Sequence, residues 1–401
     1  MLELEEALAR ILATIPPPVV ERVPLNQAHG RFLADTILCP IDLPIFDNSS
    51  MDGYAVRAED VASAKPDSPV RLQLTGKVAA GEMYDGEVTS KACVRLFTGA
   101  PLPRGADAVV MQEDVRLESG EPGEIGVLDP VKPWENVRLQ GEDVKRGTPL
   151  ARAGNLLTTG AISLLAAAGL TEVTVGRRPS VGILSTGSEL KEPGQPLASG
   201  QIYESNRISL AALTRKAGGL PAAFPLVPDT LADTRAALAE ALERSEVLVS
   251  SGGVSVGEMD FLKQAFEQVG GEVQFWKVAV KPGRPSVCGR RRDKFLFGLP
   301  GNPVSALITF LLLVRPALLR WQGAQEVGLL RCPGVLAEPL ANPGERRHFM
   351  RVKMDAMGKI YSAGVQASHA LGSLAAANGL VDVPPRTTLA AGISVQMIRW
   401  E

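Results

Sequence analysis

A glycine-rich segment that follows a short apolar run constrains the fold of this chain more than any other feature. Val247-Leu248-Val249 breaks at once into Ser250-Ser251-Gly252-Gly253-Val254-Ser255-Val256-Gly257-Glu258-Met259-Asp260. Apolar residues at helical spacing follow from Phe261 to Val269. A buried strand that ends in small hydroxyl residues and glycines, directly before a helix, leaves backbone N–H groups free to face an anion. The segment therefore predicts a phosphate-binding loop.

Two further apolar runs end in a similar way. Residues 273–280 run into Lys281-Pro282-Gly283-Arg284-Pro285, and residues 295–297 run into Gly298-Leu299-Pro300-Gly301-Asn302-Pro303. Helical patterns at residues 205–217 and 230–244 alternate with apolar runs, the first of them at residues 179–184. This alternation predicts a three-layer α/β domain with a parallel-type sheet and helices on both faces. Ligands bind outside the carboxyl ends of the strands in such sheets, so we expect the chemistry there.

Known nucleotide-binding fingerprints are absent after these runs. Neither G-x-G-x-x-G nor G-x-x-x-x-G-K-[ST] follows any of them, which argues against dinucleotide-binding and P-loop proteins.

The rest of the chain indicates further structural units. Residues 4–15 read as a helix that ends at a run of three prolines, and residues 25–30 and 37–44 read as extended. Short alternating runs with Gly-rich turns predict an all-β region over residues 70–141, followed by a helix over residues 156–169. The segment from residue 330 onward is strand-rich. We expect a β-rich insertion after which the chain returns to the α/β domain.

Composition excludes several classes of protein. The net charge of −2 gives no footprint for nucleic-acid binding. The four cysteines are far apart, which favours reduced thiols over disulfides or a zinc site. The beginning of the chain is acidic, and the most apolar segment, residues 307–314, is too short to cross a bilayer. We expect a cytoplasmic protein without membrane or nucleic-acid partners.

Seven motifs in order give the chain a specific resemblance. They are Asn48-Ser49-Ser50-Met51-Asp52-Gly53-Tyr54-Ala55, Thr98-Gly99-Ala100-Pro101, Gly141-Glu142-Asp143, Ser185-Thr186-Gly187, Ser250-Ser251-Gly252-Gly253-Val254-Ser255-Val256-Gly257, Lys281-Pro282-Gly283 and Leu299-Pro300-Gly301-Asn302-Pro303. With them the chain resembles the MoeA family of molybdopterin molybdenumtransferases over nearly its whole length. The resemblance implies insertion of molybdate into adenylylated molybdopterin by a magnesium-dependent site, with release of AMP.

The resemblance also implies four domains and a homodimer. The expected domains are an α/β molybdopterin-binding domain (residues 1–22 and 177–325), a linking domain (23–45 and 139–176), a β-rich inserted domain (46–138) and a C-terminal β-barrel-like domain (326–401). The expected cleft combines the loops of residues 252–281 and Arg351 of one chain with the Asp52 and Thr98 loops of the other. A molybdopterin adenylyltransferase and proteins that mature molybdoenzymes are further expected partners.

Site residues follow position by position from the family pattern. The expected catalytic residues are Asp52, Asp143, Asp260, Lys277 and Lys281. The expected substrate-binding residues are Thr98, Glu189, Ser251, Gly252, Gly253, Ser255, Gly257, Pro300, Arg351 and Ser368. The expected magnesium ligands are Asp260, Asp229 and Glu189. No residue is an obvious nucleophile, so we expect catalysis by metal and electrostatic positioning.

Lys277 and Lys281 lie four residues apart. If one strand persists through both, alternation puts their side chains on one face, where with Arg351 they would hold oxyanion oxygens.

Plainer interpretations stay open for several of these residues. Asp beside Asn, Ser and Gly more commonly caps or shapes a turn, which applies to Asp47 and Asp52. Glu189 is also explained as a charge that favours a helix N-terminus, and Lys277 as a solvated charge at a strand end. Asp229 stands alone where many relatives have paired acids. The rival functions are a non-catalytic scaffold of the same family and a molybdopterin adenylyltransferase, which would lack the insertion and the final unit.

Overall fold

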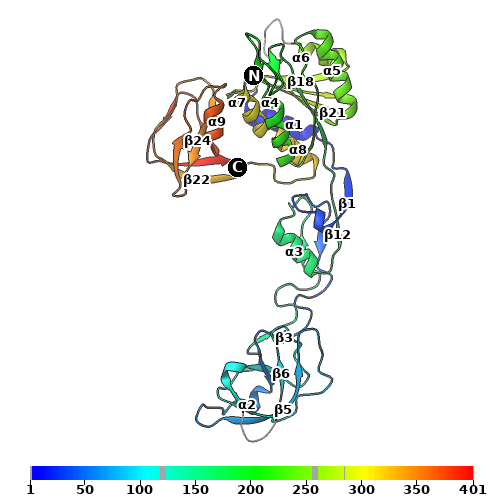
Figure 1. Ribbon diagram of the computed structural model, residues 1–401, viewed down its shortest axis with the longest axis vertical. Coiled ribbons are helices and arrows are strands. Elements are labelled where there is room, and N and C mark those ends of the chain that lie inside the picture. Colours follow the sequence, from blue (N-terminus) through cyan, green and yellow to red (C-terminus); the bar gives the residue numbers. More distant parts are fainter. Residues whose placement is uncertain (1, 118–122, 255–260, 284, 401) are drawn as a thin grey trace. The chain divides into compact units, whose positions relative to one another are not determined.

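The computed structural model describes residues 2–117, 123–254, 261–283 and 285–400, and it divides into two compact units. The first unit comprises Met1–Asp35, Ala153–Thr158 and Glu172–Glu401, and the second comprises Thr36–Arg152 and Thr159–Thr171. Figure 1 shows both units and labels many of their helices and strands. The β-rich insertion expected from the sequence belongs to the second unit, whereas the finer division into four domains stays a prediction.

The first unit contains a six-stranded sheet, here called the α/β sheet. Its order is β16 (Leu220–Ala223), β13 (Ser180–Ser185), β17 (Val247–Ser251), β21 (Lys294–Leu299), β20 (Val287–Arg291) and β18 (Glu272–Trp276). The first four strands are parallel, and β20 is antiparallel to both of its neighbours. The predicted parallel-type sheet is therefore confirmed, with one reversed strand.

Helices cover both faces of the α/β sheet because its central strands are apolar on both sides. Val249 and Phe297 pack with residues of α1 (Leu4–Thr14), α4 (Asn206–Lys216), α7 (Pro303–Thr309) and α8 (Arg315–Trp321). Leu248 and Leu296 point to the other face and pack with α5 (Leu231–Arg244) and α6 (Leu262–Gln268). This arrangement is the three-layer domain that the sequence predicts.

The longest apolar helical segment belongs to this core. Pro303–Trp321 comprises α7, the π-helical η3 (Phe310–Val314) and α8, and it is long and apolar enough to pass as a membrane span by length and composition. Its most apolar window is 83% buried inside the protein, as in the core helix of a folded domain. The segment therefore packs against the α/β sheet.

A second six-stranded sheet of the first unit contains the C-terminal strands. Its order is β19 (Val280–Lys281), β24 (Arg347–Met354), β25 (Lys359–Ser362), β22 (Arg331–Leu336), β28 (Ser394–Arg399) and β26 (Gly379–Val383). β26 also pairs with β24, which closes five strands into a barrel around Met350, Val352 and Met397. The helix α9 (Leu371–Ala376) precedes β26, and β23 (Leu340–Asn342) pairs with β27 (Thr387–Leu389). The expected barrel-like domain is confirmed.

One predicted strand is divided between these two sheets. The sequence pattern suggested a continuous strand over residues 273–280, but β18 ends at Trp276 and β19 begins at Val280 in the barrel sheet. Lys277 between them has a backbone φ of +85°, in the left-handed region that no β-strand adopts. The alternation argument that put Lys277 and Lys281 on one face of one strand is therefore wrong.

The remaining pieces of the first unit are short. They are β1 (Val20–Pro24), which pairs with β12 (Glu172–Gly176), the 3₁₀ helix η1 (Leu25–Gln27), and the pair β14 (Leu190–Lys191) and β15 (Ile202–Tyr203). The 3₁₀ helix replaces the extended structure expected at residue 25.

The second unit contains a third six-stranded sheet. Its order is β7 (Ala108–Met111), β4 (Gly53–Val56), β6 (Ala92–Leu96), β5 (Val70–Val78), β9 (Glu124–Val127) and β8 (Val115–Leu117). The smaller pairs are β3 (Asn48–Ser49) with β10 (Val137–Arg138) and β2 (Ile37–Leu38) with β11 (Pro149–Ala151). Two helices, α2 (Ala58–Val61) and α3 (Thr159–Ala167), and the 3₁₀ helix η2 (Gln112–Asp114) complete it.

Candidate active site at the carboxyl ends of the strands

The carboxyl ends of three parallel strands meet at one edge of the α/β sheet. Ser185 of β13, Ser251 of β17 and Leu299 of β21 are register partners in successive strand pairs. The loops that follow them begin with Thr186, Gly252 and Pro300. Parallel pairing thus brings three of the predicted motifs together, although they are separated in sequence.

A cavity of about 550 Å³ opens beside these loops. Its lining includes Ser185, Thr186, Glu189, Glu204, Asn206, Ser251, Gly301, Asn302 and His369. The apolar side chains of Leu190, Ile202 and Leu371 complete the wall, so the cavity suits a ligand with both hydrogen-bonding and apolar parts. The predicted residues Glu189 and Ser251 both line it.

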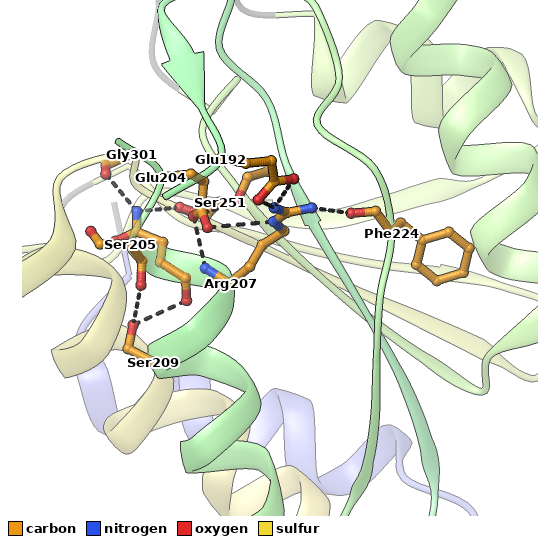
Figure 2. A network of polar contacts seen from close by, with 10 residues as sticks. Glu192, Glu204, Ser205, Arg207, Ser209, Phe224, Ser251 and Gly301 are labelled. Atoms are coloured by element: carbon orange, nitrogen blue, oxygen red, sulfur yellow. Dashed lines mark hydrogen bonds and ion pairs between the residues drawn. The ribbon is translucent and has the colours of Figure 1, made fainter. Parts of the chain in front are cut away.

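Asn206 at the start of α4 ties two of the loops together. Its Nδ2 donates to Ser251 Oγ and to the carbonyl oxygen of Gly301, at 2.7 Å in each case. Ser251 Oγ in turn donates to the carbonyl oxygen of Pro300 at 3.3 Å. Figure 2 shows the contacts to Ser251 and Gly301. These bonds fix the glycine loop after β17 against the proline loop after β21.

An ion-pair network centred on Glu204 and Arg207 holds part of the cavity wall in place. Glu204 is 4% exposed and accepts hydrogen bonds from Ser185 Oγ at 3.0 Å and from Arg207 N at 2.8 Å. Arg207 also donates to both carboxylate oxygens of Glu192 at 2.6 Å and to the carbonyl oxygen of Phe224 (Figure 2). The charge of Glu204 is compensated by Arg207, and the network fixes the Ser185 hydroxyl in the wall.

Two polar atoms in the cavity wall have no hydrogen-bond partner among the described residues. Thr186 Oγ1 and Asn206 Oδ1 are both buried and unpartnered there. Buried polar groups without partners are costly, about 1–3 kcal/mol each, and native sites usually satisfy them with ligand or water. Both residues line the cavity, so its wall contains oxygens that the described residues leave unpaired.

The glycines after β17 are required by their surroundings. Gly252 has a φ of +92°, and a Cβ on it would lie 2.5 Å from the carbonyl oxygen of Thr186. Gly253 has a φ of +66°, and a Cβ there would lie 3.0 Å from Thr186 Oγ1. The backbone of this loop therefore approaches the loop after β13 as closely as only glycine permits. The predicted residues Ser255, Gly257 and Asp260 lie outside the described residues.

The two described carboxylates predicted to bind metal come from adjoining segments. Ser188 N donates to Asp229 Oδ2 at 3.0 Å, and Asp229 N donates to Ser188 Oγ at 3.0 Å. Glu189 follows Ser188, and its Oε2 lies 2.7 Å from where a Cβ on Gly187 would be. Among the described residues no group of three or more His, Cys, Asp or Glu side chains forms a metal centre. A metal held here would thus have few protein ligands.

Arg351 is fully buried in β24, beneath the loop that carries Ser368. Its Nε donates to Ser373 Oγ at 2.9 Å, and its Nη2 donates to the carbonyl oxygens of Val365 and Ala367 at 2.6 and 3.0 Å. Its Nη1 has no partner within the described part of the chain. Burial lowers the pKa of this guanidinium.

The loop above Arg351 reaches the candidate cavity. The Ser368 carbonyl oxygen accepts from Val304 N at 3.2 Å, and His369 lines the cavity.

The two predicted lysines lie apart from one another. Lys277 N donates to the Ser286 carbonyl oxygen at 3.0 Å at the end of β18. Lys281 is the register partner of His348 in the barrel sheet, and both line a pocket of about 480 Å³. Strand alternation puts Arg351, three residues after His348, on the other face of β24. The structure thus does not gather Lys277, Lys281 and Arg351 on one strand face.

The predicted residues of the second unit form their own arrangement. Asp52 Oδ1 accepts from Thr98 N and from Thr98 Oγ1, at 2.8 Å each. These hydrogen bonds, the backbone one first, hold the pKa of the Asp52 carboxyl below its ordinary value. Asp143 is exposed, and its N donates to the Leu43 carbonyl oxygen. Two loops singled out from sequence are therefore joined by one carboxylate.

Sequence reasoning missed Glu204, Asn206 and Arg207. The only local signal is the polar run Glu204-Ser205-Asn206-Arg207 at the beginning of a helical pattern, which predicts an N-terminal cap equally well. Nothing in the sequence pairs Asn206 with Gly301.

Comparisons with known proteins identify the family of the chain. Family models match residues 2–169 (MoeA N-terminal region, domain I and II), 182–320 (probable molybdopterin binding domain) and 333–400 (MoeA C-terminal region, domain IV). A protein of Haemophilus influenzae named molybdopterin molybdenumtransferase is 43% identical over 327 residues, covering 81% of this chain and 79% of that protein. Mycobacterium tuberculosis molybdopterin molybdenumtransferase 2 is 40% identical over 386 residues, 94% of each chain.

A solved structure extends the likeness to the whole fold. The molybdopterin biosynthesis moeA protein from Pyrococcus horikoshii OT3 superposes with a TM-score of 0.85 at 32% identity, and the match covers 100% of both chains. With three family models that together span most of the sequence and relatives of this similarity, the chain belongs to the MoeA family.

Proposed function

We propose that this protein is a molybdopterin molybdenumtransferase, which inserts molybdate into the dithiolene of adenylylated molybdopterin and releases AMP. The observation that carries the proposal is the polar cavity at the carboxyl ends of β13, β17 and β21, with its unpartnered Thr186 and Asn206 oxygens. The names of the family's curated relatives support transfer of molybdenum to molybdopterin, and the family resemblance adds the adenylylated substrate and the release of AMP. A substrate with phosphates and polar ring groups satisfies such a wall.

The described residues have distinct roles in this proposal. The loop at Gly252 brings backbone close to the substrate phosphates, and Asn206 holds that loop to Gly301. Lys277 and Lys281 are the cations assigned to phosphate or molybdate oxygens. Arg351 is fully buried, and its guanidinium holds the carbonyl oxygens of Val365 and Ala367 in the loop that carries Ser368.

Magnesium fits the carboxylates near the cavity. Mg²⁺ usually binds through one or two carboxylates together with water and substrate phosphates, and dedicated all-protein cages are uncommon. Glu189 and Asp229 provide that number from adjoining segments, with Asp260 as a further expected ligand. When bound, the ion would neutralise phosphate charge, while Ser188 holds the Asp229 carboxylate in place.

We propose that the working protein is a cytoplasmic homodimer in which Asp52 and Thr98 of one subunit, with Asp143, contribute to the site of the other. The family resemblance motivates this proposal, and the joined Asp52 and Thr98 loops supply a preorganised carboxylate. A molybdopterin adenylyltransferase is the expected donor of the substrate. Sedimentation that shows a fully active monomer at micromolar concentration would contradict the dimer.

One assay tests the proposed reaction directly. The purified protein is incubated with adenylylated molybdopterin, magnesium and molybdate, and AMP and mature cofactor are both quantified. We expect equal amounts of the two products and no AMP when molybdate is omitted. A protein that binds the substrate but releases no AMP would instead be a scaffold.

A further inference from the structure

A second cavity lies at the amino ends of the strands of the α/β sheet, opposite the proposed substrate site at their carboxyl ends. It measures about 640 Å³ and is lined entirely by residues of the first unit. Arg178 lies two residues before β13 begins, and Gly218 lies two residues before β16 begins. Because β13 and β16 are parallel, the cavity lies at their amino ends. It is therefore separate from the loops at the carboxyl ends.

Basic side chains dominate the wall of this cavity. Arg178, Arg215, Lys216 and Arg315 line it, against the single carboxylate of Glu326. These cations come from three separate segments of the chain, the approach to β13, the last turn of α4 and the start of α8. Basic residues at the end of α4 are favourable to its dipole in any case, but this does not account for Arg178 or Arg315.

The hydrogen bonds of the cavity leave two guanidinium groups, those of Arg178 and Arg215, without a partner among the described residues. Arg315 Nη1 donates to the carbonyl oxygens of Val327 and Gly328 at 2.9 and 3.2 Å, and Lys216 Nζ donates to that of Trp400. Arg178 makes no hydrogen bond or ion pair with any described residue, and its Nε is buried.

Arg178 also lies close to another cation. Burial lowers the pKa of Arg178, and the positive charge of Arg31 acts in the same direction. Arg31 itself is 6% exposed and pairs with Glu21, whose carboxylate acts on Arg178 in the opposite direction. An anion bound beside Arg178 would gain a charge-assisted contact from a guanidinium that no described residue uses.

We propose that this cavity is a second anion-binding site, which takes a small phosphate-bearing molecule between Arg178, Arg215 and Arg315. Phe32 and Leu319 add an apolar wall, so the site accommodates more than a bare phosphate. Its volume exceeds what one phosphate needs, which leaves room for a nucleoside monophosphate. The proposal is independent of the reaction assigned to the carboxyl edge.

Isothermal titration of the whole protein tests the site with two probes, inorganic pyrophosphate and AMP, each at low and at physiological salt. The variant Arg178→Gln removes an unpartnered charge, and Arg235→Gln, on the exposed surface of α5, removes a charge elsewhere. We expect Arg178→Gln to weaken one binding event about tenfold, in keeping with the loss of a charge-assisted contact. Arg235→Gln should titrate like the parent.

Two further variants separate this site from the substrate site and from misfolding. Arg215→Gln changes an exposed side chain of the same cavity and should weaken the same event without affecting the fold. Ser251→Ala changes the substrate site and should leave that event intact. Tighter binding of AMP than of pyrophosphate identifies a nucleotide site, and the reverse order identifies a site for phosphate groups alone. Parental titrations in both Arg178→Gln and Arg215→Gln overturn the proposal.

Discussion

Lys281 and His348 are register partners across β19 and β24 and line the same pocket. His348 is 3% exposed, and neither of its ring nitrogens has a hydrogen-bond partner among the described residues. Burial lowers the pKa of His348 to about 4, and the positive charges of Lys281, Arg351 and Arg346 reinforce that shift. The imidazole is therefore neutral at physiological pH, and the three nearby cations favour that neutral form.

This pairing predicts that acid destabilises the protein through His348. In the unfolded chain the imidazole takes up a proton near its ordinary pKa of 6.5, whereas the folded protein resists protonation until about pH 4. The folded-state pKa is depressed, so the free energy of unfolding is highest above pH 6.5 and falls as the pH drops toward 4. The loss is at most about 3 kcal/mol.

Urea titrations at several pH values measure this loss. His348→Leu should flatten the profile in that window, and His369→Gln, which changes an exposed imidazole, should retain the parental slope. An unchanged slope in His348→Leu would place the proton uptake on another group.

Asn206→Ala should loosen the candidate active site. It removes the two 2.7 Å bonds that join Ser251 to Gly301, which predicts a stability loss of about 1–3 kcal/mol and a larger loss of AMP release. Ser209→Ala, one turn further along α4, removes a hydroxyl that bonds only to its own helix and serves as the control. Equal activity of the two variants would contradict a positioning role for Asn206.

Gly252→Ala should disrupt the loop after β17 more than the same substitution at a glycine that has a positive φ but open space around it. Its Cβ would meet the Thr186 carbonyl oxygen at 2.5 Å, whereas Gly270, with a φ of +81°, has no atom within 4 Å of a new Cβ. We expect Gly270→Ala to cost about 1 kcal/mol and Gly252→Ala clearly more, with loss of activity only in the latter. Thermal unfolding of both variants decides this.

Lys281→Ala should raise the molybdate concentration needed for AMP release while the fold persists, because its side chain is not part of a core. Added molybdate should restore part of the rate. The same change removes the cation that lowers the pKa of His348 most, so the pKa of that imidazole should move upward, which NMR titration detects. Parental activity at limiting molybdate would remove Lys281 from the site.

Sequence patterns predicted those parts of the fold that local chemistry determines. The helix α5 was predicted because its apolar spacing follows Thr230, whose side chain accepts from Asp233 N as an N-terminal cap. The strand β17 and its glycine loop were predicted from an apolar run that ends in small residues. The break at Lys277 was not predictable, because the left-handed position is occupied by lysine and carries no glycine signal.

Contacts between loops that are distant in the sequence were also not predictable from it. Asp52 and Thr98 were both named from sequence, but their hydrogen bonds join positions 46 residues apart, and no local pattern encodes that distance. Asn206 likewise contacts Gly301 across 95 residues. Such contacts arise from strand order, which becomes known only when the sheet is assembled.

The short passage between β18 and β19 limits how far the barrel can swing away from the α/β sheet. Trp276 ends a strand of one sheet and Val280 begins a strand of the other, so four residue steps, about 14 Å when fully stretched, tether the two. At the barrel end of this connection, Arg346 Nη1 donates a hydrogen bond to the Val280 carbonyl oxygen at 2.8 Å. Any displacement of the barrel therefore pulls directly on the segment that contains Lys277, which lies between the two strands.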